Sequence, residues 1–266
     1  LIDTIYRNIY YLIIGKFYTA VQLGYYTRAE EFNKVFSNNL TTVIQRVSYP
    51  IFCSIQDDAE RLRQTYKRVI KSTMIVAFSC MLGLAAVAKS LVLILIGVKW
   101  LPAVGFLQII CLAGMFYPLH AINLNMLMVK GRSDLFLKLE IIKKFLAVLP
   151  IVLGIFYGIE VMLWGSVIVS FASYFVNSFY SEMLVNYSTW SQIKDISPGL
   201  LVSFIVAFTM WSITLLNYSE WITFTLQCAL GIILFIGIHE TIKLTEYNEI
   251  KGVFKSIIKK NLNYKM

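Results

Sequence analysis

Residues 196–219 read ISPGLLVSFIVAFTMWSITLLNYS, and residues 221–239 read WITFTLQCALGIILFIGIH. Neither stretch contains Asp, Glu, Lys or Arg, and only Glu220 separates them. A helix needs roughly 20 predominantly apolar residues to cross the bilayer core of about 30 Å. The two stretches therefore predict two transmembrane helices joined by a short turn.

The same pattern extends over most of the chain. Four further stretches lack charged residues, namely 72–88, 100–129, 145–159 and 161–181. The stretch 145–159 reaches membrane length only if Ile141 and Ile142 are included, past Lys143 and Lys144, whose long side chains can extend to the interface. The composition agrees, because 58% of the 266 residues are hydrophobic and 15% are charged, against about 25% charged residues in soluble domains. We therefore predict an all-α, polytopic helical membrane protein.

The first 55 residues are more polar but contain no proline before Pro50, and their apolar residues follow helical spacing. A soluble amphipathic domain is one interpretation. The dense apolar residues of 8–15 and 17–27 instead favour two further spans that face a polar interior. The predicted transmembrane domain, residues 1–244, thus has about eight helices: 2–23, 27–53, 69–88, 101–129, 135–157, 160–186, 198–217 and 221–243. Leu1 begins directly in apolar sequence without the features of a signal peptide, so we expect the chain to be a fragment.

The basic residues predict the orientation. Seventeen of the 24 Lys and Arg residues lie in 56–71, in 130–144, at Lys194 and in the tail 245–266 with nearby Lys243. These segments fall on one side of the membrane if every span crosses once, and short basic loops stay in the cytoplasm. We therefore predict a cytoplasmic carboxyl terminus. The basic tail is either an interfacial helix on an anionic leaflet or a solvated extension.

Motifs for covalent chemistry are not found in the sequence. The four cysteines are scattered singly, and His120 and His239 stand far apart, so no spacing suits a metal or redox site. The sequence has no nucleophile elbow and no phosphate-binding glycine loop. The excess of basic residues is explained by cytoplasmic loops rather than by nucleic acid. We predict no cofactor, no metal, no nucleic-acid partner and no catalytic residue, and hence a protein that is not an enzyme.

Polar residues in the second predicted span are the main functional signal. At about 100° per residue, Arg28 and Arg46 fall on one helix face, with Asn39 and Thr42 within about 40° of it. Arginine offers a bidentate fork to phosphate oxygens, and the amide and hydroxyl groups suit sugar hydroxyls. The alternative is that both arginines lie at the ends of the span and extend into the interfaces.

Short motifs over residues 13–133 carry a family resemblance. They are IIGKF at 13–17, LGYYTRA at 23–29, VSYPIF at 47–52, QDD at 56–58 followed by Arg61-Leu62, GVKWLPA at 97–103 and GRS at 131–133. In this order they resemble the Wzx/WzxC-like oligosaccharide flippases of polysaccharide biosynthesis, in the multidrug/oligosaccharidyl-lipid/polysaccharide (MOP) exporter superfamily. Residues 134–266 agree with that family in hydropathy and number of spans.

The resemblance implies about fourteen spans in two lobes, with this chain as the carboxyl-terminal lobe of a MOP/MATE-like transporter and the missing amino-terminal lobe as its partner. In such proteins the first two helices of each lobe line a central, often cationic cavity. The resemblance therefore makes Arg7, Lys16, Arg28, Asn39 and Arg46 candidate cavity-lining residues that bind substrate. It also implies translocation of a polyprenyl-diphosphate-linked oligosaccharide across the bacterial inner membrane by alternating access, for O-antigen, capsule or exopolysaccharide synthesis.

Three alternatives remain at this point. A drug or cation antiporter of the same superfamily would place acidic residues in the cavity, and in the polar span only Glu30 and Glu31 qualify. A membrane-embedded polysaccharide polymerase would bring a large external loop with catalytic groups. A structural membrane subunit would bury the polar stripe against other helices or expose it to lipid.

Overall fold

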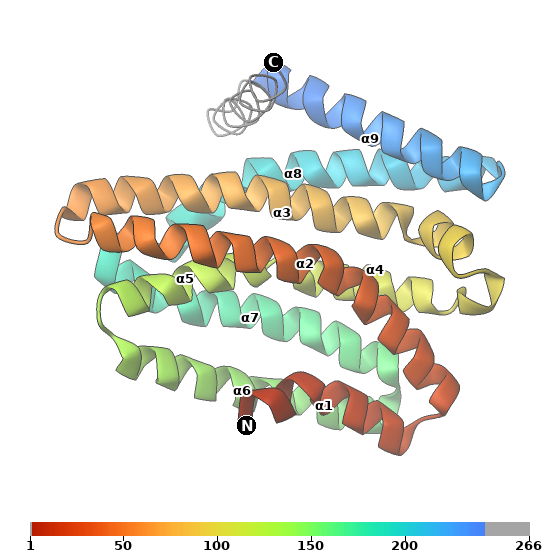
Figure 1. Ribbon diagram of the computed structural model, residues 1–266, viewed down its shortest axis with the longest axis horizontal. Helices are drawn as coiled ribbons and strands as arrows, with labels where there is room; N and C mark the ends of the chain where they lie inside the picture. The colour runs from red at the N-terminus through yellow and green to blue at the C-terminus, as the bar shows by residue number, and fades with distance from the viewer. Residues whose placement is uncertain (1, 243–266) are drawn as a thin grey trace, which may run out of the picture.

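The computed structural model describes residues 2–242, and the side chains of residues 8–241. Over this range the chain is helical and contains no strand (Figure 1). The helices are α1 (Ile2–Phe17), α2 (Ala20–Ser54), α3 (Ala59–Leu95), α4 (Ala103–Gly114), α5 (Tyr117–Val129), α6 (Ser133–Tyr157), α7 (Ile159–Val185), α8 (Thr189–Ser212) and α9 (Glu220–Ile242), with 3-10 turns η1 (Val98–Trp100) and η2 (Ile213–Leu216). The predicted basic tail, 245–266, lies outside the described residues.

The long helices lie side by side, and the connections between them gather at two ends of the bundle (Figure 1). Residues 55–58, 130–132 and 186–188 connect helices at the end drawn on the left, which we call the basic end. Residues 96–102 and 217–219 connect helices at the opposite end. Two of the basic segments found in the sequence, 56–71 and 130–144, begin at the connections of the basic end.

Capping side chains set where several helices begin. The Thr19 side chain accepts a hydrogen bond from the Gln22 backbone N–H, and the Gln22 side chain accepts one from the Thr19 N–H, which forms a capping box at the start of α2. The boundary expected between the first two spans, at residues 24–26, falls inside α2 for this reason. Asp58 caps α3 with a single hydrogen bond, which its side chain accepts from the Arg61 N–H at 3.0 Å.

The span expected at 101–129 is divided into two helices. Helix α4 ends at Gly114, and α5 begins at Tyr117 with Pro118 in its first turn. Proline has no backbone N–H to donate to the preceding turn. The break at 115–116 lies in the middle of the apolar segment Ala103–Val129, and irregular backbone at that depth is tolerated where protein or a cavity surrounds it.

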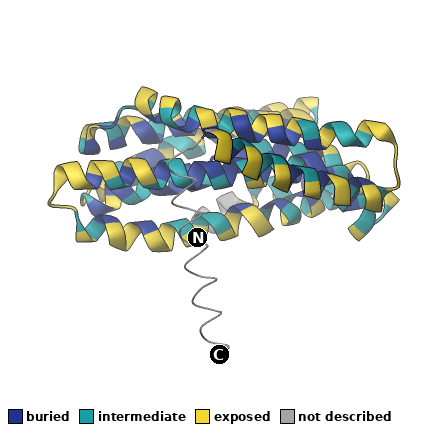
Figure 2. Ribbon diagram, turned by 90° about the horizontal axis from the view of Figure 1, so that it is seen from above, coloured by how far each residue is buried: buried dark blue, intermediate teal, exposed yellow. Residues whose placement is uncertain are grey.

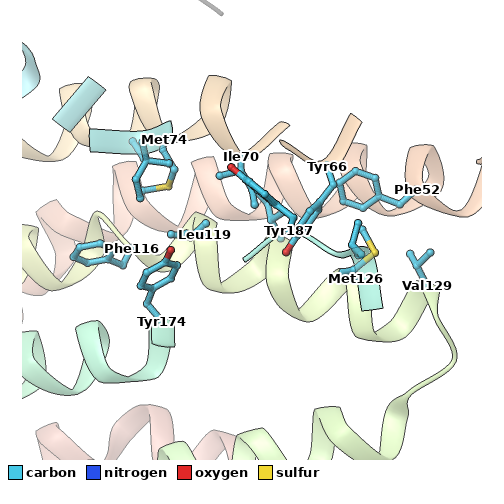
Figure 3. Close-up of a cluster of buried hydrophobic side chains, with 14 of the residues drawn as sticks. Phe52, Tyr66, Ile70, Met74, Phe116, Leu119, Met126, Val129, Tyr174 and Tyr187 are labelled. Carbon is cyan, nitrogen blue, oxygen red and sulfur yellow. The ribbon is translucent and has the colours of Figure 1, made fainter. Parts of the chain in front are cut away.

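An aromatic and aliphatic cluster joins α2, α3, α5 and α7 near the basic end (Figure 3). The rings of Phe52 and Tyr66 meet edge to face, with centroids 5.7 Å apart. The buried Tyr66 hydroxyl donates a hydrogen bond to the Asn123 Oδ1 atom. Because the phenol has a partner, it can be buried without the cost of an unpaired polar group.

Exposed residues cover much of the outside of the bundle (Figure 2), and many of them are large apolar residues. Phe156 is 76% exposed and Trp221 is 69% exposed, which is the arrangement expected where lipid is the solvent. Within the described residues, five helical segments are long and apolar enough to cross a membrane, namely Ala59–Leu95, Ala103–Val129, Ile159–Val185, Thr189–Leu216 and Glu220–Thr241. Helices α2 and α6, with 35 and 25 residues, are also long enough to cross a membrane, but they carry charged side chains. Several of these charged side chains face a cavity inside the bundle.

Candidate functional site

A polar cavity of about 810 Å³ lies between helices of this bundle, and we call it the central cavity. Helices α1, α2, α4, α5, α6 and α7 contribute to its wall. Its polar lining residues are Asn8, Tyr10, Tyr26, Glu30, Lys34, Asn38, Thr41, Thr42, Gln45, Tyr117, His120, Glu140, Lys143, Lys144, Ser166, Ser170 and Ser173. Burial of a charged side chain in the bilayer core costs free energy, so charged residues in membrane segments tend to face water-filled cavities or partners. The charged residues listed above face such a cavity.

One face of α2 supplies the longest polar wall of the cavity. Tyr26, Glu30, Lys34 and Asn38 follow at intervals of four residues, so their side chains lie above one another along the helix. The Lys34 Nζ atom lies 3.7 Å from the Glu30 carboxylate and donates to the Tyr11 hydroxyl at 2.9 Å. The Lys34 ammonium is therefore held between a carboxylate and a phenol from α1.

Helix α6 faces α2 across the cavity with a second set of charges. Glu140, Lys143 and Lys144 line the cavity, and the Lys143 ammonium forms an ion pair with Glu140 one turn away. Lys143 lies about 15 Å along the axis from the start of α6 at Ser133. The two lysines counted in the basic connection 130–144 are thus inside the helix and at the cavity, not in the loop.

The break between α4 and α5 opens onto the same cavity. The Ser170 hydroxyl, on α7, donates to the Ala113 carbonyl at 3.0 Å and lies 3.2 Å from His120 Nε2. The Asn177 Nδ2 atom lies 3.3 Å from His120 Nδ1. Both ring nitrogens of His120 thus lie within hydrogen-bond distance of a polar side chain, and its tautomer decides which nitrogen donates.

The chemical character of the cavity follows from these groups. Three lysines and two glutamates leave its lining with a net positive charge, and each glutamate has a lysine on its own helix. Amide, hydroxyl and phenol groups fill the space between the charges. Such a lining can bind an anionic group by charge and a carbohydrate by hydrogen bonds. In the part of the chain with described side chains, no group of three His, Cys, Asp or Glu residues could hold a metal ion.

The residues proposed from the sequence lie elsewhere on the same helices. Arg28 is exposed, forms a 2.6 Å ion pair with Glu31 and stacks over the Trp100 ring at 5.5 Å. Asn39 donates to the Val35 carbonyl of its own helix at 2.7 Å. Lys16 and Arg46 are exposed and, like Arg28 and Asn39, do not line the central cavity. Arg7 lies in α1, but its side chain is outside the described set.

The face with Arg28, Asn39 and Arg46 is turned about 120° around α2 from the face that lines the cavity. The structure therefore keeps these three residues on one helix face but does not bring them together with Glu30 or Lys34. Their role in substrate binding stays a prediction.

The sequence did not predict that the charges of α6 line a cavity. The spacing of Glu140 and Lys143, three residues apart within a helix, is the signal that could have identified them. The sequence places Lys143 and Lys144 inside the expected helix 135–157, but it predicts that their side chains extend to the cytoplasmic interface rather than into a cavity.

The architecture defines a class of membrane protein: a multi-pass helical bundle with a charged cavity inside the membrane region. Its fold is similar to that of the lipid II flippase MurJ in an inward closed conformation, with a TM-score of 0.65 and 19% sequence identity. The similarity covers 86% of this chain and 48% of the MurJ chain. The predicted all-α membrane fold is therefore confirmed.

Sequence comparisons indicate which membrane proteins of this class the chain resembles. Residues 1–105 match the family model described as polysaccharide biosynthesis protein. The chain is 30% identical over 154 residues to the lipopolysaccharide biosynthesis protein WzxC of Escherichia coli K12, covering 58% of this chain and 31% of WzxC. It is 29% identical over 135 residues to the teichuronic acid biosynthesis protein TuaB of Bacillus subtilis 168, covering 51% of this chain and 28% of TuaB. The resemblance predicted from the short motifs is confirmed, and the chain spans about a third of the length of these relatives.

Proposed function

We propose that this chain forms one lobe of a transporter that moves a polyprenyl-diphosphate-linked oligosaccharide across a bacterial inner membrane for surface polysaccharide synthesis. The central cavity is the observation that carries this proposal, because it places lysines and many hydrogen-bonding groups inside a bundle whose outer surface is apolar. The names of the relatives, which concern polysaccharide biosynthesis and a lipid flippase, support it. The matched 48% of the MurJ chain supports a second lobe as partner.

The proposed mechanism needs no covalent step. A sugar-diphosphate headgroup cannot enter hydrocarbon because its hydration would be lost without replacement. In the cavity, Asn38, Thr41 and Gln45 replace water around the sugar hydroxyls, while Lys143 and Lys144 face the phosphate oxygens. The lipid tail stays in the bilayer, and alternating exposure of the cavity to the two sides moves the headgroup. The chain then works as a transporter rather than as an enzyme.

The proposed orientation places the basic end in the cytoplasm. The connections 55–58 and 130–132 lie at that end together with the amino terminus of α8. The rule that short basic loops remain cytoplasmic supports this assignment. The cavity then opens to lipid-linked intermediates made on the cytoplasmic side and releases them on the other.

A second candidate function is ion-coupled export of a cationic drug. Glu30 and Glu140 in the cavity favour it, because an antiporter of this superfamily would need an acidic site. Each carboxylate has a lysine within ion-pair distance, so the cavity as it stands attracts anions more than cations. We therefore rank this function second.

Complementation of a flippase-deficient bacterium tests the proposal with the full-length protein that contains this chain. The variants are Lys143→Gln with Lys144→Gln, which removes charge from the cavity wall, and Arg28→Ala with Arg46→Ala, which removes the outer stripe. Lys99→Gln is the matched control, because Lys99 is an exposed lysine at the opposite end of the bundle. All variants are compared at equal membrane abundance.

The expected result is that the wild type and the Lys99 variant restore surface glycan. The Lys143 and Lys144 double variant is expected to accumulate lipid-linked oligosaccharide on the cytoplasmic side and to lower surface glycan at least tenfold, because charge-assisted contacts to phosphate contribute about 1.5–3 kcal/mol each. Normal glycan in that variant would contradict a role for the cavity lysines. A wild type that fails to restore glycan but exports drugs would support the second function instead.

A further inference from the structure

A second, smaller cavity lies between α3 and α8 near the basic end. Its volume is about 80 Å³, and its lining residues are Lys71, Ile75, Lys194, Asp195, Ile196, Pro198 and Gly199. No residue of the central cavity contributes to it. The two cavities are therefore separate sites, and the proposed transport path leaves this one without a role.

The single acidic residue of the small cavity is already engaged by neighbours. The Asp195 carboxylate lies 2.9 Å from the Lys67 ammonium and accepts a hydrogen bond from the Tyr187 hydroxyl at 2.7 Å. Burial, together with the adjacent Asp195 charge, raises the pKa of Tyr187 above its usual range, so its hydroxyl keeps the donated proton. The lining of the small cavity contains two lysines, Lys71 and Lys194, against one carboxylate, Asp195, so its net charge is positive.

The size of the small cavity limits its ligand. A water molecule occupies about 30 Å³ in the liquid, so this cavity has room for one group of a few heavy atoms, such as a phosphate. It has no room for a sugar chain. The floor is closed because Gly199 packs directly against Ile75, where an added Cβ atom would lie 3.0 Å from the Ile75 Cγ1 atom.

An apolar track leads away from the small cavity along α8. Lys194 and Pro198 line the cavity, and Leu201, Ile205 and Phe208 continue the same helix face at intervals of three or four residues. The last three side chains are 61%, 53% and 58% exposed. The distance from Pro198 to Phe208 along the axis is about 15 Å, which equals half of the bilayer core of about 30 Å.

The charges and the apolar track together fit one molecule of the surrounding membrane. We propose that this site binds an anionic phospholipid of the leaflet at the basic end, with its phosphate between Lys71 and Lys194 and an acyl chain along Leu201, Ile205 and Phe208. The basic segment 56–71 raises the local concentration of anionic lipid at that leaflet. Trp190 lies about one turn before Lys194 on α8 and has 75% of its surface exposed, and exposed tryptophans are common at the headgroup region of a membrane.

Native mass spectrometry of the full-length protein that contains this chain, released from micelles supplemented with phosphatidylglycerol or phosphatidylcholine, tests this proposal. The protein is expected to retain phosphatidylglycerol in preference to phosphatidylcholine. Lys71→Gln with Lys194→Gln is expected to weaken that retention about tenfold, because lysines near an anionic surface each contribute to lipid attraction. Ile205→Gln, which makes the track polar, is expected to weaken it as well. Lys99→Gln at the opposite end is the control and should retain the lipid as the wild type does.

Several results would overturn the proposal. Equal retention of the two lipids by the wild type, or unchanged retention in the lysine double variant, would show that the site does not select an anionic lipid. Inorganic phosphate that displaces the lipid completely at millimolar concentration would show a simple anion site without the acyl track. Circular dichroism and the unfolding temperature of each variant distinguish a lost site from a lost fold, and loss of binding counts as support only in a variant that keeps both.

Discussion

Replacement of Gly165 by alanine tests how closely α6 and α7 must pack to form the cavity wall. A Cβ atom at Gly165 would lie 2.6 Å from the Pro150 Cβ atom and 3.2 Å from the Pro150 Cα atom. The proline ring cannot rotate away, so the two helices must separate by roughly 1 Å to reach a normal carbon contact. Overpacking of this kind costs about 1–3 kcal/mol.

The matched control is Gly83→Ala in α3. An added Cβ atom at Gly83 would have no neighbour within 4 Å, so this variant only gains helix propensity, about 0.5–1 kcal/mol. The two substitutions are chemically identical, and they are expected to have effects of opposite sign. Gly165→Ala gains the same propensity, so its net loss should be about 1 kcal/mol, within a range of about 0–2.5 kcal/mol.

The assay is reversible unfolding of each variant in mixed micelles, with helical circular dichroism as the signal. The same variants are then measured for glycan export at equal abundance. We expect reduced export for Gly165→Ala, because a shift of α7 displaces Ser166, Ser170 and Ser173 from the opposite cavity wall. A Gly165→Ala protein as stable as the Gly83→Ala protein would refute the close packing described for α6 and α7.

Two further outcomes follow from single hydrogen bonds. Tyr66→Phe removes the donor to the buried Asn123 Oδ1 atom, so the free energy of unfolding should fall by about 1–3 kcal/mol; an unchanged value would mean that Asn123 finds another partner. Thr19→Ala removes the acceptor for the Gln22 N–H at the start of α2, which should cost about 1 kcal/mol and increase amide exchange at residues 20–23, while unchanged exchange there would contradict the capping box.

The sequence predicted the helical membrane fold because the relevant signal is local. A stretch such as 221–239 has no charged residue, and the bilayer alone then requires a helix. Helix ends were harder to predict, since they depend on hydrogen bonds of single side chains. The Thr19 and Gln22 box moved the first boundary by several residues, and nothing in the hydropathy of 20–26 indicates that helix α2 begins there.

The cavity face of α2 could not be predicted from the helical wheel. A helical wheel gives the angular position of each polar residue but not its burial. In the structure Asn33 and Ser37 are buried, whereas Arg46 is exposed. Asn33 lies against Gly114, where an added Cβ atom would be 2.7 Å from the Asn33 Oδ1 atom. That contact between α2 and α4 fixes the rotation of α2, and it joins residues 81 positions apart. The lysines of α6 were likewise expected at the membrane interface, because their cavity exists only after α2 and α6 face each other.

The pairing of Glu30 with Lys34, and of Glu140 with Lys143, has a consequence for biosynthesis. Both ion pairs join residues one turn apart on a single helix, so each pair can form as soon as its own helix forms. A nascent α2 or α6 therefore reaches the lipid phase with these carboxylates already neutralised, which lowers the cost of insertion before any neighbouring helix has been made. The charged residues of the finished cavity are thus compatible with insertion of the helices into the membrane one at a time during translation.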